Sequence, residues 1–185
     1  MNRAQIWRTS PDLLLGAALV GLDVLVRLLP HAWQFTTLAA SALFAAAMFR
    51  TRILSLAVPL IALAISDGIM GFYDWRVMSV VYAASVLPAA MALYVSPWRS
   101  VAVLLSLCLA SSVSFFLTTN FAVWAFEGIY SHDLAGLTAC YVAALPFFKN
   151  TVIGDLFWTC ALFGGYQLFR MRLATLESRT TGTAA

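Results

Sequence analysis

Long apolar runs, separated by short polar breaks, repeat along almost the whole chain. About 20 consecutive apolar residues are needed for a helix to cross the hydrocarbon core of a bilayer, and six runs approach or exceed that length. The breaks contain the residues that end helices, namely proline, arginine and glycine. The pattern therefore predicts an all-α integral membrane protein, a bundle of six transmembrane helices. These cover approximately Leu13–Leu29, Trp33–Phe49, Ile53–Met70, Val77–Val95, Val101–Phe126 and Thr151–Phe169.

One apolar stretch, Leu137–Phe148, does not fit this scheme, because it is only 12 residues long before Lys149. Stretches of that length are typical of re-entrant or interfacial segments rather than of membrane crossings. We therefore expect a short re-entrant or interfacial segment before the last helix.

Composition and charge support a membrane location and give an orientation. The 185 residues are 62% hydrophobic and 10% charged, whereas soluble domains are about 25% charged. With six crossings and an inner N-terminus, most arginines fall on the inner side, as the positive-inside rule requires. Both termini are therefore predicted to be cytoplasmic, with one transmembrane domain over residues 1–172 and a flexible cytoplasmic tail over residues 173–185. No run of Lys and Arg indicates nucleic-acid binding.

Four charged side chains lie within the predicted helices, namely Asp23, Arg27, Asp67 and Asp155, and Asn120 joins them as a strongly polar group. Ionisable groups inside a membrane are costly and commonly functional. At 1.5 Å per residue, all five fall in the outer half of the bilayer, although their helices run in opposite directions. This predicts a polar cavity that opens to the outer face. The structural alternative is that Asp23 neutralises Arg27 one turn away, and that Asn120 and Asp155 only link helices.

Aromatic residues are concentrated in the outer loops, where they could form a lipid-interface belt or close the predicted cavity. The loops Phe72–Arg76 and Gly128–Gly136 are predicted lids, joined by an Arg76–Asp133 ion pair. The candidate ligand-binding residues are Asp67, Asn120, Trp124, Asp155, Tyr73 and Arg76.

Catalytic motifs are lacking in this sequence. It contains no HExxH, no Gly-rich phosphate loop, no GxSxG and no paired-cysteine metal site. We therefore expect a protein that is not an enzyme and that carries no metal or cofactor. A membrane enzyme that uses Asp67 and Asp155 as acid and base is a minor alternative.

Three stretches resemble an uncharacterised family of small bacterial membrane proteins: Pro59–Gly68 (PLIALAISDG), Leu117–Trp124 (LTTNFAVW) and Leu134–Asp155 (LAGLTACYVAALPFFKNTVIGD). The likeness extends over most of residues 28–169. That family in turn resembles, more distantly, the substrate-binding S-components of energy-coupling-factor vitamin transporters, including the solitary cobalamin-binding type called BtuM. The BtuM type has a cysteine near the start of helix four, where this chain reads Trp75-Arg76-Val77-Met78-Ser79-Val80. Its cysteine chemistry is therefore not transferred to this chain.

The resemblance implies a multi-pass protein of the bacterial inner membrane that binds a vitamin or metal-related micronutrient for uptake. Its implied partners are the lipid bilayer, the small molecule and a transporter energising module. The alternative function is a membrane scaffold or assembly protein whose buried polar residues are structural.

Overall fold

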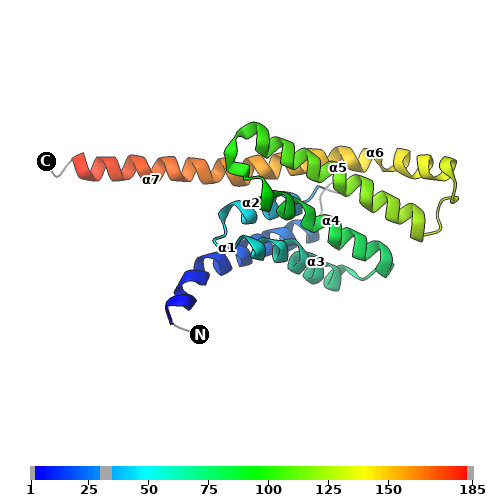
Figure 1. Ribbon diagram of the computed structural model, residues 1–185, viewed down its shortest axis with the longest axis horizontal. Helices are drawn as coiled ribbons and strands as arrows, with labels where there is room; N and C mark the ends of the chain where they lie inside the picture. Colours follow the sequence, from blue (N-terminus) through cyan, green and yellow to red (C-terminus); the bar gives the residue numbers. More distant parts are fainter. Residues whose placement is uncertain (1–2, 30–34, 183–185) are drawn as a thin grey trace.

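The computed structural model describes the backbone of residues 3–29 and 35–182 and the side chains of residues 11–29 and 35–176. This part of the chain is helical throughout and has no strand. Its elements, shown in Figure 1, are α1 (Arg3–Leu28), α2 (Leu38–Met48), η1 (Arg52–Leu56), α3 (Ala57–Met70), α4 (Trp75–Tyr94), η2 (Pro97–Arg99), α5 (Val101–Phe126), α6 (Leu134–Thr159), η3 (Cys160–Gly164) and α7 (Gly165–Gly182).

The described residues make six helical passes, because η1 leads directly into α3, and α6, η3 and α7 are continuous. Successive passes alternate in direction, so the start of α1 and the end of α7 lie on the same side of the bundle (Figure 1). Helix α4 packs against α5 and α2, α5 packs against α6, and α1 packs against α3. The prediction of an all-helical bundle with six helices is confirmed at this level.

Four helical stretches are long and apolar enough to cross a membrane, which indicates a membrane protein: Arg52–Met70, Trp75–Tyr94, Val101–Phe126 and Leu134–Leu176. The predicted bounds of the fifth helix, Val101–Phe126, match α5. Its start is well defined, because the Ser100 hydroxyl accepts a hydrogen bond from the Val103 N–H at 3.1 Å and caps the helix. The predicted second helix is shorter than expected. It begins at Leu38, and Trp33, its predicted start, lies outside the described residues.

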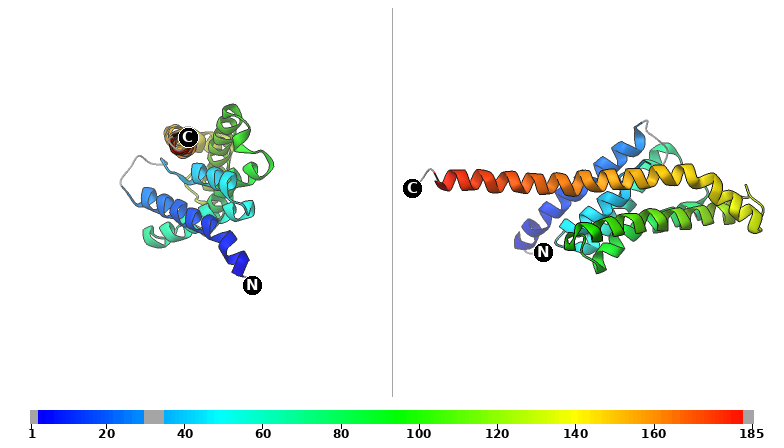
Figure 2. Two further views of the ribbon diagram at one scale, coloured as in Figure 1. Left: turned by 90° about the vertical axis from the view of Figure 1, so that its left-hand side faces the viewer. Right: turned by 90° about the horizontal axis from the view of Figure 1, so that it is seen from above.

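The prediction of a separate re-entrant segment at Leu137–Phe148 is wrong. These residues belong to α6, which continues through Pro146 and Lys149 without a break. The helical stretch Leu134–Leu176 has 43 residues and is roughly 64 Å long at 1.5 Å per residue. It forms the long rod in the right-hand view of Figure 2. The short length of the apolar stretch before Lys149 suggested a separate segment, but the helix continues, and Pro146 within it is tolerated where neighbouring groups satisfy the freed carbonyl. The helix also continues past residue 172, where the tail was predicted to begin.

The main hydrophobic core joins α2 to η2, η3 and the nearby ends of α4 and α5. The Phe163 ring lies edge-on to Phe44, with centroids 5.1 Å apart, and 4.9 Å from the Trp98 ring. The Trp98 indole N–H also donates to the Ala47 carbonyl at 3.2 Å, which satisfies its polar atom. We call this region the packed end of the bundle, and the region near the 71–74 and 127–133 loops the hollow end.

Candidate ligand-binding cavity

The hollow end contains two neighbouring chambers between α1, α4, α5 and α6. The larger has a volume of about 320 Å³ and is lined by aromatic and small polar side chains, among them Tyr73, Phe116, Thr119, Asn120 and Phe148. The smaller has a volume of about 40 Å³, and its lining includes Ser85, Ser111 and Asp155. Both chambers are lined by Arg27, Val81, Phe115 and Thr151, so they share a wall. The larger volume lies at the low end of the range for small-molecule sites.

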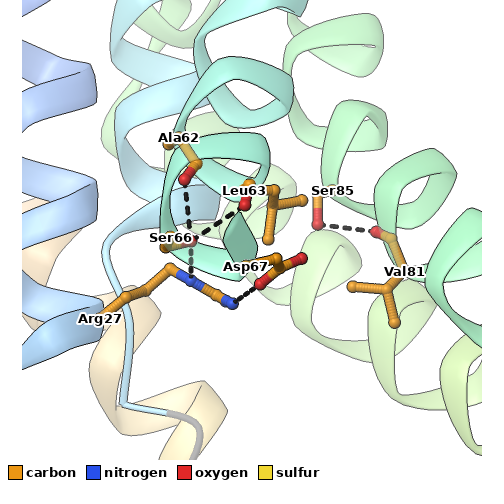
Figure 3. A network of polar contacts seen from close by, with 7 residues as sticks. All are labelled: Arg27, Ala62, Leu63, Ser66, Asp67, Val81 and Ser85. Atoms are coloured by element: carbon orange, nitrogen blue, oxygen red, sulfur yellow. Dashed lines mark hydrogen bonds and ion pairs between the residues drawn. The ribbon is translucent and has the colours of Figure 1, made fainter. Parts of the chain in front are cut away.

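Arg27 reaches the chambers from α1 while it is anchored to α3 (Figure 3). Its Nη2 lies 2.6 Å from Oδ1 of Asp67, and its Nε donates to the Ser66 hydroxyl at 2.7 Å. The Ser66 hydroxyl in turn donates to the Ala62 carbonyl at 2.8 Å. Asp67 is 1% exposed, so the ion pair compensates for the cost of burying its charge. Asp67 therefore acts on the cavity through Arg27.

Asp155 comes from α6 and is 4% exposed. Its Oδ2 accepts a hydrogen bond from the Ser112 hydroxyl on α5 at 2.6 Å. Among the described residues, the ion pairs are Arg27–Asp67 and Arg76–Asp74, so Asp155 has no cationic partner there. Asp155 thus presents a buried carboxylate to the smaller chamber.

Asn120 and Tyr73, two of the candidate ligand-binding residues, both line the larger chamber. The Asn120 Nδ2 donates to the Phe116 carbonyl one turn back at 2.8 Å. Tyr73 lies in the loop between α3 and α4. Within the predicted lid Phe72–Arg76, it is Tyr73 that lines the larger chamber. The structure therefore brings Tyr73, Asn120 and Asp155 to the two chambers.

Trp124 and Arg76 lie elsewhere. The Trp124 indole N–H donates to the Ser131 carbonyl at 2.9 Å, and the His132 ring lies edge-on to the indole, so Trp124 orders the α5–α6 loop. Arg76 pairs with Asp74 at 2.7 Å and lies over the Phe126 ring. This pairing with Arg76 lowers the pKa of Asp74 to about 2.

The predicted Arg76–Asp133 link between the lids is not formed. Asp133 instead caps α6, because its Oδ1 accepts from the Gly136 N–H at 2.7 Å and from the Ser131 hydroxyl at 2.9 Å. Asp133 finds a backbone donor in the first turn of α6, the Gly136 N–H, and Arg76 finds a carboxylate two residues away, that of Asp74. Both groups therefore have local partners.

Asp23 and Arg27 do not neutralise each other as the structural alternative proposed. Asp23 is completely buried and accepts hydrogen bonds from the Thr37 and Ser41 hydroxyls, the second at 2.6 Å. It is not among the residues that line either chamber. Asp23 thus joins α1 to the start of α2, while Arg27 joins α1 to α3.

The family comparison agrees with the first part of the sequence-based resemblance. A family described as "Family of unknown function (DUF6580)" matches residues 8–177. The chain belongs to this family. Among curated proteins and among solved structures, nothing matches the chain, so the more distant likeness to vitamin-transporter S-components has no support there.

Several residues that shape the cavity of this DUF6580 member were not predicted from the sequence. Arg27 was recognised as an intramembrane charge but was not assigned to the site, because Asp23 one turn away was an obvious partner. Ser112, which holds Asp155, and Thr119 and Thr151, which line the larger chamber, were also missed. Hydroxyl side chains are frequent in helices of this composition, so no sequence signal separated these three from the rest.

Proposed function

We propose that the chain is a membrane-embedded substrate-binding protein for the uptake of a small micronutrient, such as a vitamin or a metal-related compound. The observation that supports this best is the cavity of about 320 Å³ at the hollow end, which combines aromatic walls with the Asn120 amide and the Arg27 guanidinium. Ligand sites are mostly apolar with a few convergent polar groups, and this lining has that character. The energising module implied by the resemblance stays a prediction.

In the proposed topology, the chain crosses the bacterial inner membrane six times with both termini in the cytoplasm, and the hollow end faces outward. The alternating helix directions and the arginine distribution support this arrangement. Reporter fusions after Arg52 and after Arg172 should give a cytoplasmic signal, and a fusion within residues 127–133 a periplasmic one. A cytoplasmic signal from residues 127–133 would contradict the proposed topology.

Native mass spectrometry of the detergent-purified protein tests the binding function directly. We expect a small molecule to co-purify with the wild-type chain. Ala144 is buried and lines the larger chamber, so Ala144→Phe should fill this space and displace the molecule. Ala143 is its exposed neighbour on the same helix, so Ala143→Phe is the matched control and should retain it. If both variants lose the small molecule, or if both retain it, the result would argue against binding in this cavity.

The scaffold function is the second candidate, and the polar links between helices favour it. Asp23 joins α1 to the start of α2, and Arg27 joins α1 to α3. If the scaffold function is correct, no small molecule co-purifies, and Ala144→Phe changes only the stability of the protein. Overpacking of this kind costs about 1–3 kcal/mol.

A further inference from the structure

The four buried carboxylates of the described chain are compensated in different ways. Asp12 accepts hydrogen bonds from the backbone N–H groups of Arg50 and Thr51, at 3.0 and 3.2 Å. Asp23 has two hydroxyl donors, and Asp67 has the Arg27 guanidinium. Asp155 has one donor, the Ser112 hydroxyl. A buried carboxylate needs a counter-charge or several donors to remain ionised, so Asp155 is the least compensated of the four.

Asp155 is also the one of these four carboxylates that lines the pair of chambers. A group bound beside it would therefore be able to complete its set of partners. Arg27, the cation that lines the same chambers, is already bound to Asp67 and Ser66. A bound cation would therefore supply the counter-charge that Asp155 does not receive from the described residues.

The shared wall and the larger chamber supply a surface that suits a cation with an apolar body. Phe115 lines both chambers, and Phe116 and Phe148 lie against each other in the larger one, with ring centroids 4.5 Å apart. The faces of aromatic rings attract organic cations, and this attraction strengthens where water is excluded. A metal ion fits less well, because the described residues contain no group of three or more His, Cys, Asp or Glu side chains placed to hold one.

We propose that these chambers bind a small organic cation, a protonated amine or quaternary ammonium group on an apolar body, with Asp155 as its counter-ion. The cationic group lies toward the smaller chamber and the apolar body among the aromatic side chains of the larger one. This inference rests on the proposed binding function and specifies that the ligand is positively charged. The Ser112 hydroxyl holds the carboxylate in place.

Three probes of similar shape test the charge class on the full chain in detergent at pH 7: phenethylamine (cationic), 2-phenylethanol (neutral) and 3-phenylpropionate (anionic). We expect phenethylamine to raise the melting temperature and to bind in equilibrium dialysis at least tenfold more tightly than the other two. Equal or tighter binding of the neutral or anionic probe would overturn the inference, and so would the absence of phenethylamine binding. This comparison uses the wild-type protein, so it does not depend on the folding of any variant.

Two matched variants locate the charge. Asp155→Asn keeps the shape of the side chain and should weaken phenethylamine binding at least tenfold. Asp23→Asn changes a carboxylate that is just as buried but lies outside the chamber linings, and it should leave the affinity within about twofold. Unchanged binding in Asp155→Asn would show that the carboxylate is not the counter-ion.

The failure of this inference can be distinguished from failure of the proposed function. If a neutral or anionic molecule co-purifies with the wild type and is lost in Ala144→Phe, the binding function stands and the cationic ligand is wrong. If no molecule co-purifies and none of the probes binds, both proposals are wrong.

Discussion

The packed end and the hollow end are built from the same helices, α4 and α5, yet only one of them is filled. At the packed end, Ala89 and Ala92 of α4 and Cys108 of α5 are completely buried against α2. At the hollow end, the same two helices contribute Val81, Phe115 and Phe116 to the walls of the chambers. The two ends differ in how far the side chains between the helices fill the space.

Small side chains let helices approach closely, so their backbones and neighbouring rings fill the space between them. Rings such as Phe44 and Phe163 then close the remaining gaps at the packed end. At the hollow end, rings on α5 and α6 such as Phe116 and Phe148 line the larger chamber together with smaller side chains such as Thr119 and Ala144, and the space between them stays unfilled. The comparison indicates that the packed end supplies stability, while the hollow end gives up some packing and thereby leaves room for a ligand.

The largest expected effect is at the packed end. Leu43 is completely buried, and Leu43→Ala should lower the free energy of unfolding by about 2–5 kcal/mol. Leu38 lies on the same helix and is also buried, but it borders the smaller chamber, so Leu38→Ala should cost less. Thermal or denaturant unfolding in detergent measures both variants. An equal or larger loss for Leu38→Ala would contradict the division into two ends.

Breaking the Arg27–Asp67 pair should have the next largest effect. Asp67→Leu leaves Arg27 without its counter-ion, and we expect a loss of roughly 3 kcal/mol, since the Arg27 side chain is 17% exposed. The double variant Arg27→Met with Asp67→Leu removes both charges and should recover much of this loss. A double variant that is less stable than Asp67→Leu would show that the two residues stabilise the bundle independently.

A smaller effect is expected for Asp23→Asn. The carboxylate accepts from two hydroxyls, and an asparagine amide would place an N–H₂ group against one of them. We expect a loss of about 1–3 kcal/mol in the free energy of unfolding, because the misplaced donor leaves a buried polar group unsatisfied. Asp155→Asn, with one hydroxyl donor and an adjoining chamber, should cost less. The reverse order would indicate that Asp155 is the structural carboxylate and Asp23 is not.

The smallest effect concerns the α5–α6 loop at the hollow end and depends on pH. The Gly136 backbone N–H and the Ser131 hydroxyl lower the pKa of Asp133. An unfolded Asp has a pKa of about 3.9, so the stabilising contribution is complete above that value and is lost as the pH falls through the lower folded pKa. Asp133→Ala should therefore melt slightly below the wild type at pH 7, and the two should converge in acid. A difference that persists below pH 2 would exclude the carboxylate charge as its cause.

Much of the fold could be predicted because its signals are local. Ser100 and Pro97 mark the start of α5, and long apolar runs give the third and fourth helices to within a few residues. The prediction of a separate segment at Leu137–Phe148, ending before Lys149, failed for a physical reason. Whether a helix continues through a proline or a lysine depends on what surrounds that turn, and the sequence carries no record of those surroundings.

The sequence by itself determined that the chain is a helical bundle and that several of its helices are long and apolar enough to cross a membrane. Hydropathy and helix geometry decide both, since each depends only on residue type and spacing along the chain. Only the tertiary structure decided which groups the polar side chains within these helices contact. Arg27 had Asp23 one turn away and Asp67 forty residues away, and the approach of α3 to α1 gave it Asp67. The same packing left Asp155 with a single hydroxyl and an open chamber, because contacts between helices depend on how side chains of different sizes fit together in space.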